Sequence, residues 1–290
     1  MEIGVRIPHT GALASPRTIR EWCQVADQAG YGSLWGADHM VMPQKVESKY
    51  VLPRKPAAIA DDAVSNLLSP NYELTTTMAF AAAVTERIKI GSSVAVLPIR
   101  NAVLNARQLA TVDIYSGGRV LYGVGVGWLE EEARAMNMPW DRRGARSDEH
   151  IALLRALWTA PGPHVEFHGD FWDLPPMDPE PRPVQRPIPI LVGGHSDVAI
   201  DRAARLGDGW ITATMSPERL TELLGVLRAA ADRHGRDPQE IAVYCGADRN
   251  HSTLDQLRLY EELGVASVHV AIETLDELKR FGDEILPDLG

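Results

Sequence analysis

The sequence has few cysteines, no long apolar run and no excess of positive charge. Its two cysteines, Cys23 and Cys245, are far apart and fit no metal-ligand spacing, so we expect neither a disulfide framework nor a zinc site. No apolar stretch approaches the roughly 18 residues that a membrane span requires. The formal net charge of −10 argues against a nucleic-acid-binding surface and against adsorption to an anionic membrane.

Signals for export and for nucleophilic catalysis are missing as well. Residues 3–7 form a strand-like run at the N-terminus, without the basic segment and apolar core of a signal peptide. Together with the two unpaired cysteines, this predicts a protein of the reducing cytoplasm. The sequence contains no GxSxG or comparable nucleophile motif. If the protein is an enzyme, a bound cofactor therefore has to supply the difficult chemistry.

What the sequence does contain is a regular alternation of short apolar strands and helical segments over its 290 residues. This alternation predicts a parallel (β/α)8 TIM barrel that forms a single domain over residues 1–290. Two segments, 43–72 and 161–187, interrupt the alternation, and we interpret them as insertion loops because the pattern resumes after each. The expected strands cover residues 3–8, 33–37, 89–96, 120–126, 188–193, 209–213, 241–246 and 267–271.

In such a barrel the active site forms at the C-terminal ends of the strands, which directs attention to the residues there. The first expected strand leads to His9, and the second leads to Asp38 and His39. A histidine can exchange a proton near neutral pH and a carboxylate can orient it, so Asp38 and His39 are the candidate catalytic residues. Adjacent residues rarely face each other, so Asp38 need not be the partner of His39. A loop histidine with a structural hydrogen bond is the alternative.

Glycines mark two further strand ends. Gly123, Gly125 and Gly127 alternate in a GxGxG pattern, which is not the GxGxxG of dinucleotide-binding folds. Alternate glycines leave one face of a strand without side chains, so either a flat ring or a close neighbour of the chain can approach. The fifth strand ends at residues 193–196, Gly-Gly-His-Ser, before a helix. Amides at such a helix start bind phosphate, and Ser196 can also cap the helix.

Six segments stand in a characteristic order along the chain: residues 33–39, 109–119, 123–128, 143–149, 189–194 and 207–210. Together they resemble the luciferase-like monooxygenase superfamily, and within it the branch that uses the deazaflavin coenzyme F420. The resemblance covers most of residues 1–215 and is specific for the superfamily. It implies a barrel that moves a hydride between the deazaflavin and a small organic substrate.

The resemblance also implies roles for particular residues. It implies a non-prolyl cis peptide bond between Ser93 and Val94 behind the cofactor ring, and it places Asp38 and His39 at the ring edge near the reactive atom. The cofactor-binding set that we predict is Ser93, Val94, Gly123, Gly125, Gly193, Gly194, His195 and Ser196.

One position departs from the sugar-phosphate dehydrogenases of this branch. Those enzymes have a glutamate directly after the GxGxG-like segment, whereas this chain has Trp128. Sugar-phosphate oxidation is therefore not expected. We expect His9 and Trp128 to contact a different small-molecule substrate, and no metal is expected in the site.

Three functions remain open at this stage. The leading one is F420-dependent hydride transfer. The nearest alternative is an FMN-dependent monooxygenase, which needs reduced flavin and oxygen, and a third is a flavin-binding barrel without turnover. F420 has a polyanionic tail, and Lys45, Lys49, Arg54 and Lys55 could bind it, although a solvated loop explains these cations equally well. Dimers are common in the superfamily, so a homodimer is expected.

Overall fold

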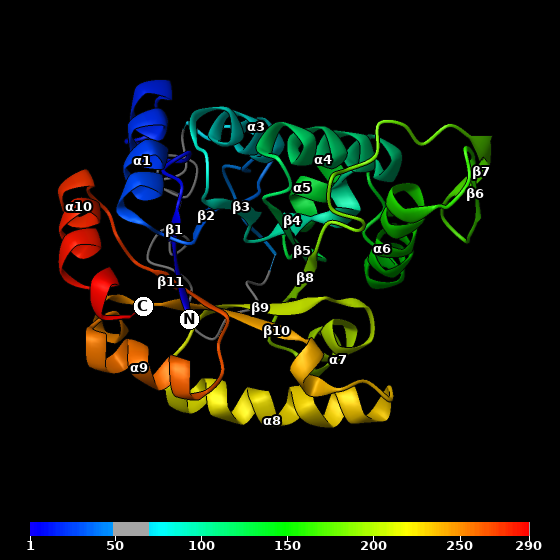
Figure 1. Cartoon of the computed structure of the whole chain (residues 1–290). Coiled ribbons are helices and arrows are strands. Elements are labelled where there is room, and N and C mark those ends of the chain that lie inside the picture. The colour runs from blue at the N-terminus through cyan, green and yellow to red at the C-terminus, as the bar shows by residue number, and fades with distance from the viewer. Residues whose placement is uncertain (49–69, 290) are drawn as a thin grey trace.

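The computed structural model describes residues 1–48 and 70–289, and its centre is a closed ring of eight parallel strands (Figure 1). Every strand pairs in parallel with both of its neighbours, and the pairing of β3 with β5 closes the ring. The predicted (β/α)8 barrel is confirmed. In ring order the strands are β1 (Glu2–Arg6), β2 (Ser33–Gly36), β3 (Lys89–Ser92), β5 (Val120–Gly125), β8 (Ile190–Gly193), β9 (Gly209–Thr214), β10 (Ala242–Ala247) and β11 (Ser267–Val270).

All eight expected strands are present, and only one is interrupted. The expected strand 89–96 is divided into β3 and β4 (Ala95–Val96), and β4 also pairs with β5. The break falls at Ser93 and Val94, two of the predicted cofactor-binding residues. The chain therefore leaves the regular sheet at the position where the sequence predicts a ligand contact.

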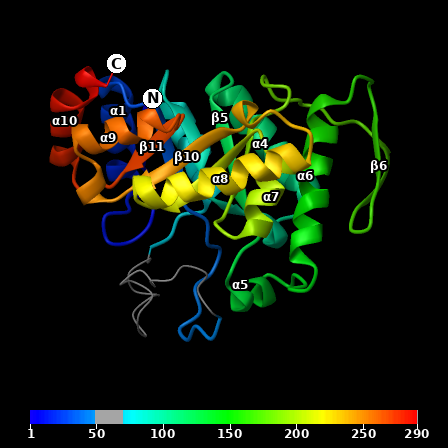
Figure 2. The same cartoon turned by 90° about the horizontal axis from the view of Figure 1, so that it is seen from below.

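Helices surround the ring (Figures 1 and 2). Two of them begin at side-chain caps: Ser216 caps α8, and Thr274 forms a capping box with Glu277 at α10. The helices are α1 (Pro16–Ala29), α3 (Leu74–Val84), α4 (Ala102–Ser116), α5 (Glu130–Ala135), α6 (Arg143–Thr159), α7 (Asp197–Leu206), α8 (Pro217–Arg233), α9 (Leu254–Glu262) and α10 (Leu275–Glu284). Short 3-10 turns are η2 (Leu97–Ile99), η3 (Pro238–Glu240), η4 (Arg249–His251) and η5 (Leu286–Asp288).

The interior of the ring is filled by a separate cluster of side chains around Trp35. Leu121, Leu191, Ile211 and Tyr244 belong to this cluster, whereas the outward residues of the strands pack against the helices. A Cβ atom at Gly91 would lie 2.4 Å from the Trp35 ring, so the large indole requires a glycine beside it. The barrel is a packed core, and ligands have to bind at its end.

The two insertions differ. Residues 161–187 contain the antiparallel hairpin of β6 (Val165–His168) and β7 (Asp173–Met177), which projects beside α6 (Figure 1). Of the first insertion, 43–72, only the two ends belong to the described residues. Lys45 forms an ion pair with Glu47 there, and the candidate cations Lys49, Arg54 and Lys55 lie outside the described residues. In the described part of the chain, no helix is both long enough and apolar enough to cross a membrane.

Candidate active site

The C-terminal ends of the strands place most of the predicted site residues at one end of the barrel. The loop after β2 and helix α5 lie together at this end, at the bottom of the view in Figure 2. Because the barrel strands are all parallel, the segments after β2, β4, β5 and β8 meet here. We refer to this end as the barrel mouth. No three His, Cys, Asp or Glu side chains gather into a metal site within the described residues.

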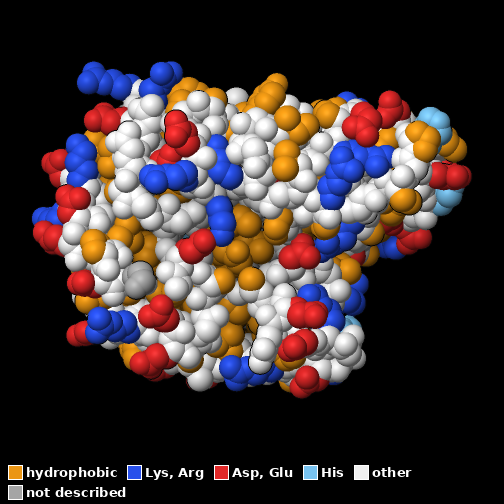
Figure 3. All heavy atoms as spheres, viewed as in Figure 1, with side chains coloured by type: hydrophobic (Ala, Val, Ile, Leu, Met, Phe, Trp, Pro, Cys, Tyr) orange, Lys and Arg blue, Asp and Glu red, His pale blue; other side chains and the backbone are white. Residues whose placement is uncertain are grey.

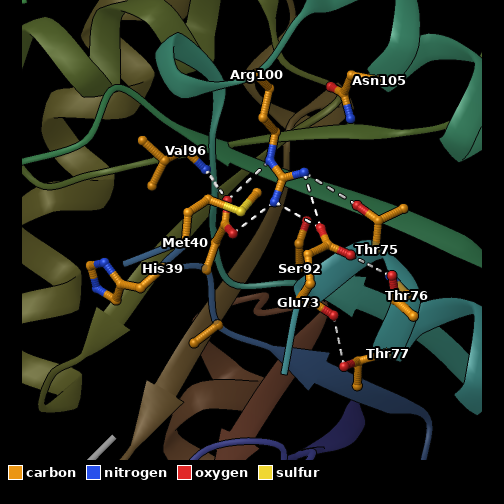
Figure 4. A network of polar contacts seen from close by, with 12 residues as sticks. His39, Met40, Glu73, Thr75, Thr76, Thr77, Ser92, Val96, Arg100 and Asn105 are labelled. Carbon is orange, nitrogen blue, oxygen red and sulfur yellow. Dashed lines mark hydrogen bonds and ion pairs between the residues drawn. The ribbon is translucent and has the colours of Figure 1, made fainter. Parts of the chain in front are cut away.

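Asp38 is part of a buried ion pair. Its Oδ1 lies 2.7 Å from Nη2 of Arg100, and its Oδ2 accepts hydrogen bonds from Arg100 Nε at 3.1 Å and from the Val96 amide at 2.8 Å (Figure 4). The Asp38 and Arg100 side chains are only 1% and 5% exposed. Asp38 therefore joins the end of β2 to β4.

Arg100 has a second carboxylate partner, Glu73, and it also contacts the hydroxyl of Thr75. Burial alone would lower the pKa of Arg100, but the charge of Asp38 outweighs this and the pKa is raised. Neither Arg100 nor Glu73 was singled out from the sequence. They do not end a barrel strand, and no motif marks them as partners of Asp38.

His39 has a different carboxylate partner, Glu132 of α5, which lies 93 residues away in the sequence. Its Nδ1 lies 3.1 Å from Oε2 of Glu132, while Oε1 accepts hydrogen bonds from the amides of Met40 at 2.5 Å and Val41 at 3.4 Å. The His39 ring meets Trp128 edge to face, with centroids 6.1 Å apart. Its Nε2 makes no hydrogen bond to any described residue, and the side chain is 20% exposed. This nitrogen is available to a ligand.

The predicted Ser93–Val94 peptide bond is cis, as expected. The Val94 side chain points toward the glycines of β5 and β8: a Cβ atom at Gly125 or at Gly193 would lie 2.8 Å from it. At Gly123 a Cβ atom would lie 2.0 Å from the Ser92 carbonyl oxygen. Of the two explanations for alternate glycines, the structure supports close neighbours of the chain. These glycines determine where Val94 sits in the mouth.

Residues 193–196 form the expected turn before α7. Gly194 has a φ of 125°, which favours glycine, and its amide donates to the Ile211 carbonyl at 3.4 Å. Ser196 caps α7 by accepting from Ala199. The His195 Nε2 accepts from the Ala213 amide at 3.0 Å, and burial lowers the pKa of this histidine. The amides of residues 195–198 donate to no described residue, so they are available to an anion although that of Gly194 is not.

His9 is placed deeper than a substrate contact would require. It is 1% exposed, and its two ring nitrogens each lie 3.0 Å from a carbonyl oxygen, those of Ile7 and Ala37. As placed, His9 ties the end of β1 to the segment after β2. It has almost no accessible surface.

Two arginines at the start of α6 form a cationic part of the rim; their segment, 143–149, carries the family resemblance, but neither was predicted as a site residue. Arg143 lies over Trp140 at 4.0 Å, and Arg146 lies over Phe171 of the second insertion at 4.7 Å. Neither guanidinium has a carboxylate partner in the described part of the chain. The helices of a (β/α)8 barrel start at its mouth, so α6 and α7 begin on the same rim, and the two helices are in contact.

Comparison with known proteins gives a consistent family match. The model of a family described as luciferase-like monooxygenase matches residues 1–249. An uncharacterized protein of Mycobacterium tuberculosis is 36% identical over 248 residues, which are 85% of this chain and 82% of that protein. The F420-dependent glucose-6-phosphate dehydrogenase of Amycolatopsis mediterranei is 28% identical over 282 residues, 93% of this chain and 78% of the relative.

A third relative uses a different cofactor. The FMNH(2)-dependent dimethylsulfone monooxygenase of Pseudomonas putida is 38% identical over 157 residues, 53% of this chain and 42% of that protein. Among solved structures, an F420-dependent secondary alcohol dehydrogenase in complex with an F420-acetone adduct superimposes with a TM-score of 0.77 at 17% identity, covering 100% of this chain and 99% of that one. At this identity the structural likeness shows the fold alone.

Proposed function

The chain belongs to the luciferase-like monooxygenase family, and we propose that it is an F420-dependent oxidoreductase that transfers a hydride between the deazaflavin and a small organic substrate. The observation that carries the proposal is the His39 imidazole. It lies at a barrel mouth, a buried carboxylate holds one of its nitrogens, and the other nitrogen is available. Hydride transfer at a carbon that bears a hydroxyl or carbonyl group also moves a proton, and a histidine can exchange that proton at neutral pH.

The residues of the mouth fit an anionic, flat cofactor. The amides of residues 195–198 and the guanidiniums of Arg143 and Arg146 are donors without acceptors in the described part of the chain, and they would hold phosphate and carboxylate groups. Val94, packed between glycines, would lie under the ring with Ser93. When bound, F420 supplies two-electron hydride chemistry.

The chain's own part in the reaction is to move one proton and to hold the site in shape. In the oxidation of an alcohol, His39 Nε2 would accept the hydroxyl proton, and in the reverse direction it would return it. Asp38 would act as a positioning residue, because its carboxylate is already occupied by Arg100 and Val96. Trp128 would form a wall of the substrate pocket, and His9 would support the pocket from behind.

A second candidate is an FMN-dependent monooxygenase, because the dimethylsulfone monooxygenase with 38% identity carries that cofactor in its name. The phosphate of FMN would meet the same amides. The two candidates differ in the rest of the anionic tail, which only F420 has. Arg143 and Arg146, two cations on a chain of net charge −10, favour the cofactor with the longer anionic tail.

The deciding experiment is a parallel fluorescence titration of purified apoprotein with F420 and FMN. We expect F420 to bind with a Kd of about 1 µM or less and FMN roughly tenfold more weakly or worse. The double substitution R143M/R146M should weaken F420 binding more than FMN binding. Tighter binding of FMN than of F420 by the wild-type protein would overturn the proposal in favour of the monooxygenase.

We also propose that the protein is a homodimer. Helix α4 exposes large apolar side chains, among them Leu104 and Tyr115 at 57% and 68%, and Figure 3 shows hydrophobic side chains along the upper edge of the molecule, over α3 and α4. Light scattering after size-exclusion chromatography should give twice the chain mass of 31.8 kDa. The double substitution L104E/Y115S should reduce that mass to one chain, and a wild-type monomer would contradict the proposal.

A further inference from the structure

The carboxylate of Glu132 lies between the His39 ring and the backbone of the residues that follow it. The Glu132 side chain is 2% exposed, and its two oxygens have separate partners. Oε1 accepts from the amides of Met40 and Val41, whereas Oε2 lies 3.1 Å from His39 Nδ1. Because the backbone amides can only donate, they fix which oxygen is left for the imidazole.

We propose that Glu132 is a positioning residue that sets the tautomer of His39, so that the proton lies on Nδ1 and Nε2 is the acceptor. An ionised carboxylate only accepts hydrogen bonds, so the nitrogen that faces it must carry the proton. In the neutral ring the other nitrogen then has a free lone pair. The inference rests on the proposed function in one respect only, which is that Nε2 accepts the proton of the substrate.

The competing explanation for the contacts of Glu132 is that this residue only anchors the loop after β2. The neighbouring residue of α5, Glu131, shows what anchoring alone looks like. Glu131 accepts from the amides of Glu47 at 2.6 Å and Ser48 at 3.0 Å, and from the Ser48 hydroxyl at 2.5 Å. Two consecutive glutamates thus hold two parts of the same loop through backbone amides. Only Glu132 touches an imidazole, so Glu131 is the matched control.

The substitution Glu132→Gln separates the two roles. The amides of Met40 and Val41 still require an acceptor, and they would select the amide oxygen of the glutamine. Its NH2 group would then face His39 Nδ1 as a donor. Nδ1 would have to accept, and the proton would move to Nε2. The loop would stay anchored while the tautomer is inverted.

The test uses the apoprotein with 15N-labelled histidine, and it reads the His39 ring nitrogens in proton–nitrogen multiple-bond spectra at a pH where the ring is neutral. We expect the Nδ1–H tautomer in the wild type, in Glu131→Gln and in Glu132→Asp, and the Nε2–H tautomer in Glu132→Gln. The His39→Gln variant assigns the signals. If Glu132→Gln does not fold, Glu132→Ala replaces it, and the loss of a single fixed tautomer is expected. The same tautomer in Glu132→Gln or Glu132→Ala as in the wild type would overturn the proposal.

Measurements of turnover provide a second test of the role of Glu132. With the cofactor bound, Glu132→Gln should lower kcat roughly 10²-fold or more, while the cofactor Kd changes less than about threefold, and Glu132→Asp should recover part of the rate. Glu131→Gln should stay near the wild-type rate. An inverted tautomer with full turnover would support the role of Glu132 and overturn that of His39 as the proton acceptor. Failure of both F420 and FMN to bind would overturn the proposed function alone.

Discussion

Asp38 and His39 are neighbours at the end of β2, but their side chains belong to two different polar networks. Asp38 and Arg100 form the buried centre of one network, which also includes Thr75, the Val96 amide and the partly exposed Glu73 (Figure 4). The His39 network, with Glu132, leaves one ring nitrogen without a partner among the residues that the structure describes. The first network has the features of a structural support, and the second has those of a reactive site.

The comparison teaches that a charged residue at a catalytic position of the barrel need not carry out chemistry. Removing one partner of a buried ion pair leaves an uncompensated charge in the interior, and this destabilises the fold. Removing a half-buried imidazole leaves a buried carboxylate that still accepts two backbone hydrogen bonds. We therefore expect substitutions in the first network to affect mainly stability and those in the second to affect mainly turnover.

The largest effect is expected for Arg100→Met. It should lower the free energy of unfolding by about 3–5 kcal/mol, because Asp38 stays buried without its counter-charge. Urea denaturation at pH 7 measures this. The control is Arg134→Met, whose exposed pair with Glu130 should contribute below about 0.5 kcal/mol. A loss under about 1 kcal/mol for Arg100→Met would mean that the two networks do not differ in this way.

The next largest effect concerns His39→Ala. It should lower kcat by roughly 10²–10⁴-fold if the imidazole is the acid/base, while cofactor affinity and the free energy of unfolding change little. Steady-state kinetics, cofactor titration and urea denaturation are compared on the same preparation. His234→Ala, which removes a surface histidine that pairs with Asp201, is the control and should be fully active. Full activity of His39→Ala would show that His39 is not the acid/base and that its contact with Glu132 has only a structural role.

The strands, and the positions of the two candidate catalytic residues at the end of β2, were predictable from the sequence because they depend on local order. Apolar runs that alternate with helical segments define eight strands, and the ends of strands give Asp38 and His39 without knowledge of any contact. The partners were not predictable in this way. Glu132 and Arg100 reach their positions through pairing of strands and packing of helices far apart in the sequence, and a run of three glutamates at 130–132 looks like an ordinary helix start.

The glycines show a different limit of sequence reasoning. Their pattern in β5 predicted close approach on one face, which is confirmed, but it could not decide what approaches. The answer depends on Val94, which belongs to the break between β3 and β4. The Val96 amide that Asp38 accepts from lies two residues further on. Val94 in the barrel mouth and the Val96 amide of the Asp38 network thus lie on the same short segment of the chain.

A smaller effect is expected for Gly125→Ala, which tests whether the Val94 side chain is the reason for glycine at this position. The added methyl group would lie 2.8 Å from Val94, and such overpacking costs typically 1–3 kcal/mol in the free energy of unfolding. Displacement of the Val94 side chain by the methyl group should also weaken cofactor binding. The double substitution G125A/V94A should restore most of the stability, since the smaller side chain makes room. If the double variant is as unstable as Gly125→Ala, Val94 does not set the requirement for glycine.

The smallest effect concerns the far end of the loop that His39 begins, where Glu131 holds Glu47 and Ser48. Burial acts to raise the pKa of Glu131, but hydrogen bonds from the Ser48 hydroxyl and from backbone amides outweigh it and lower the pKa to about 2. A carboxyl whose pKa is depressed in the folded state stabilises that state above its ordinary pKa of 4.5, and the contribution is lost as the pH falls toward 2. Solvent screens this exposed site, so the total should stay below about 1 kcal/mol. Hydrogen-exchange protection factors of the Glu47 and Ser48 amides should fall between pH 5 and pH 2 in the wild type. In Glu131→Gln they should not change between these pH values, because the glutamine amide oxygen can still accept from both amides but does not titrate. A wild-type profile without any fall would show that this carboxylate does not hold the loop.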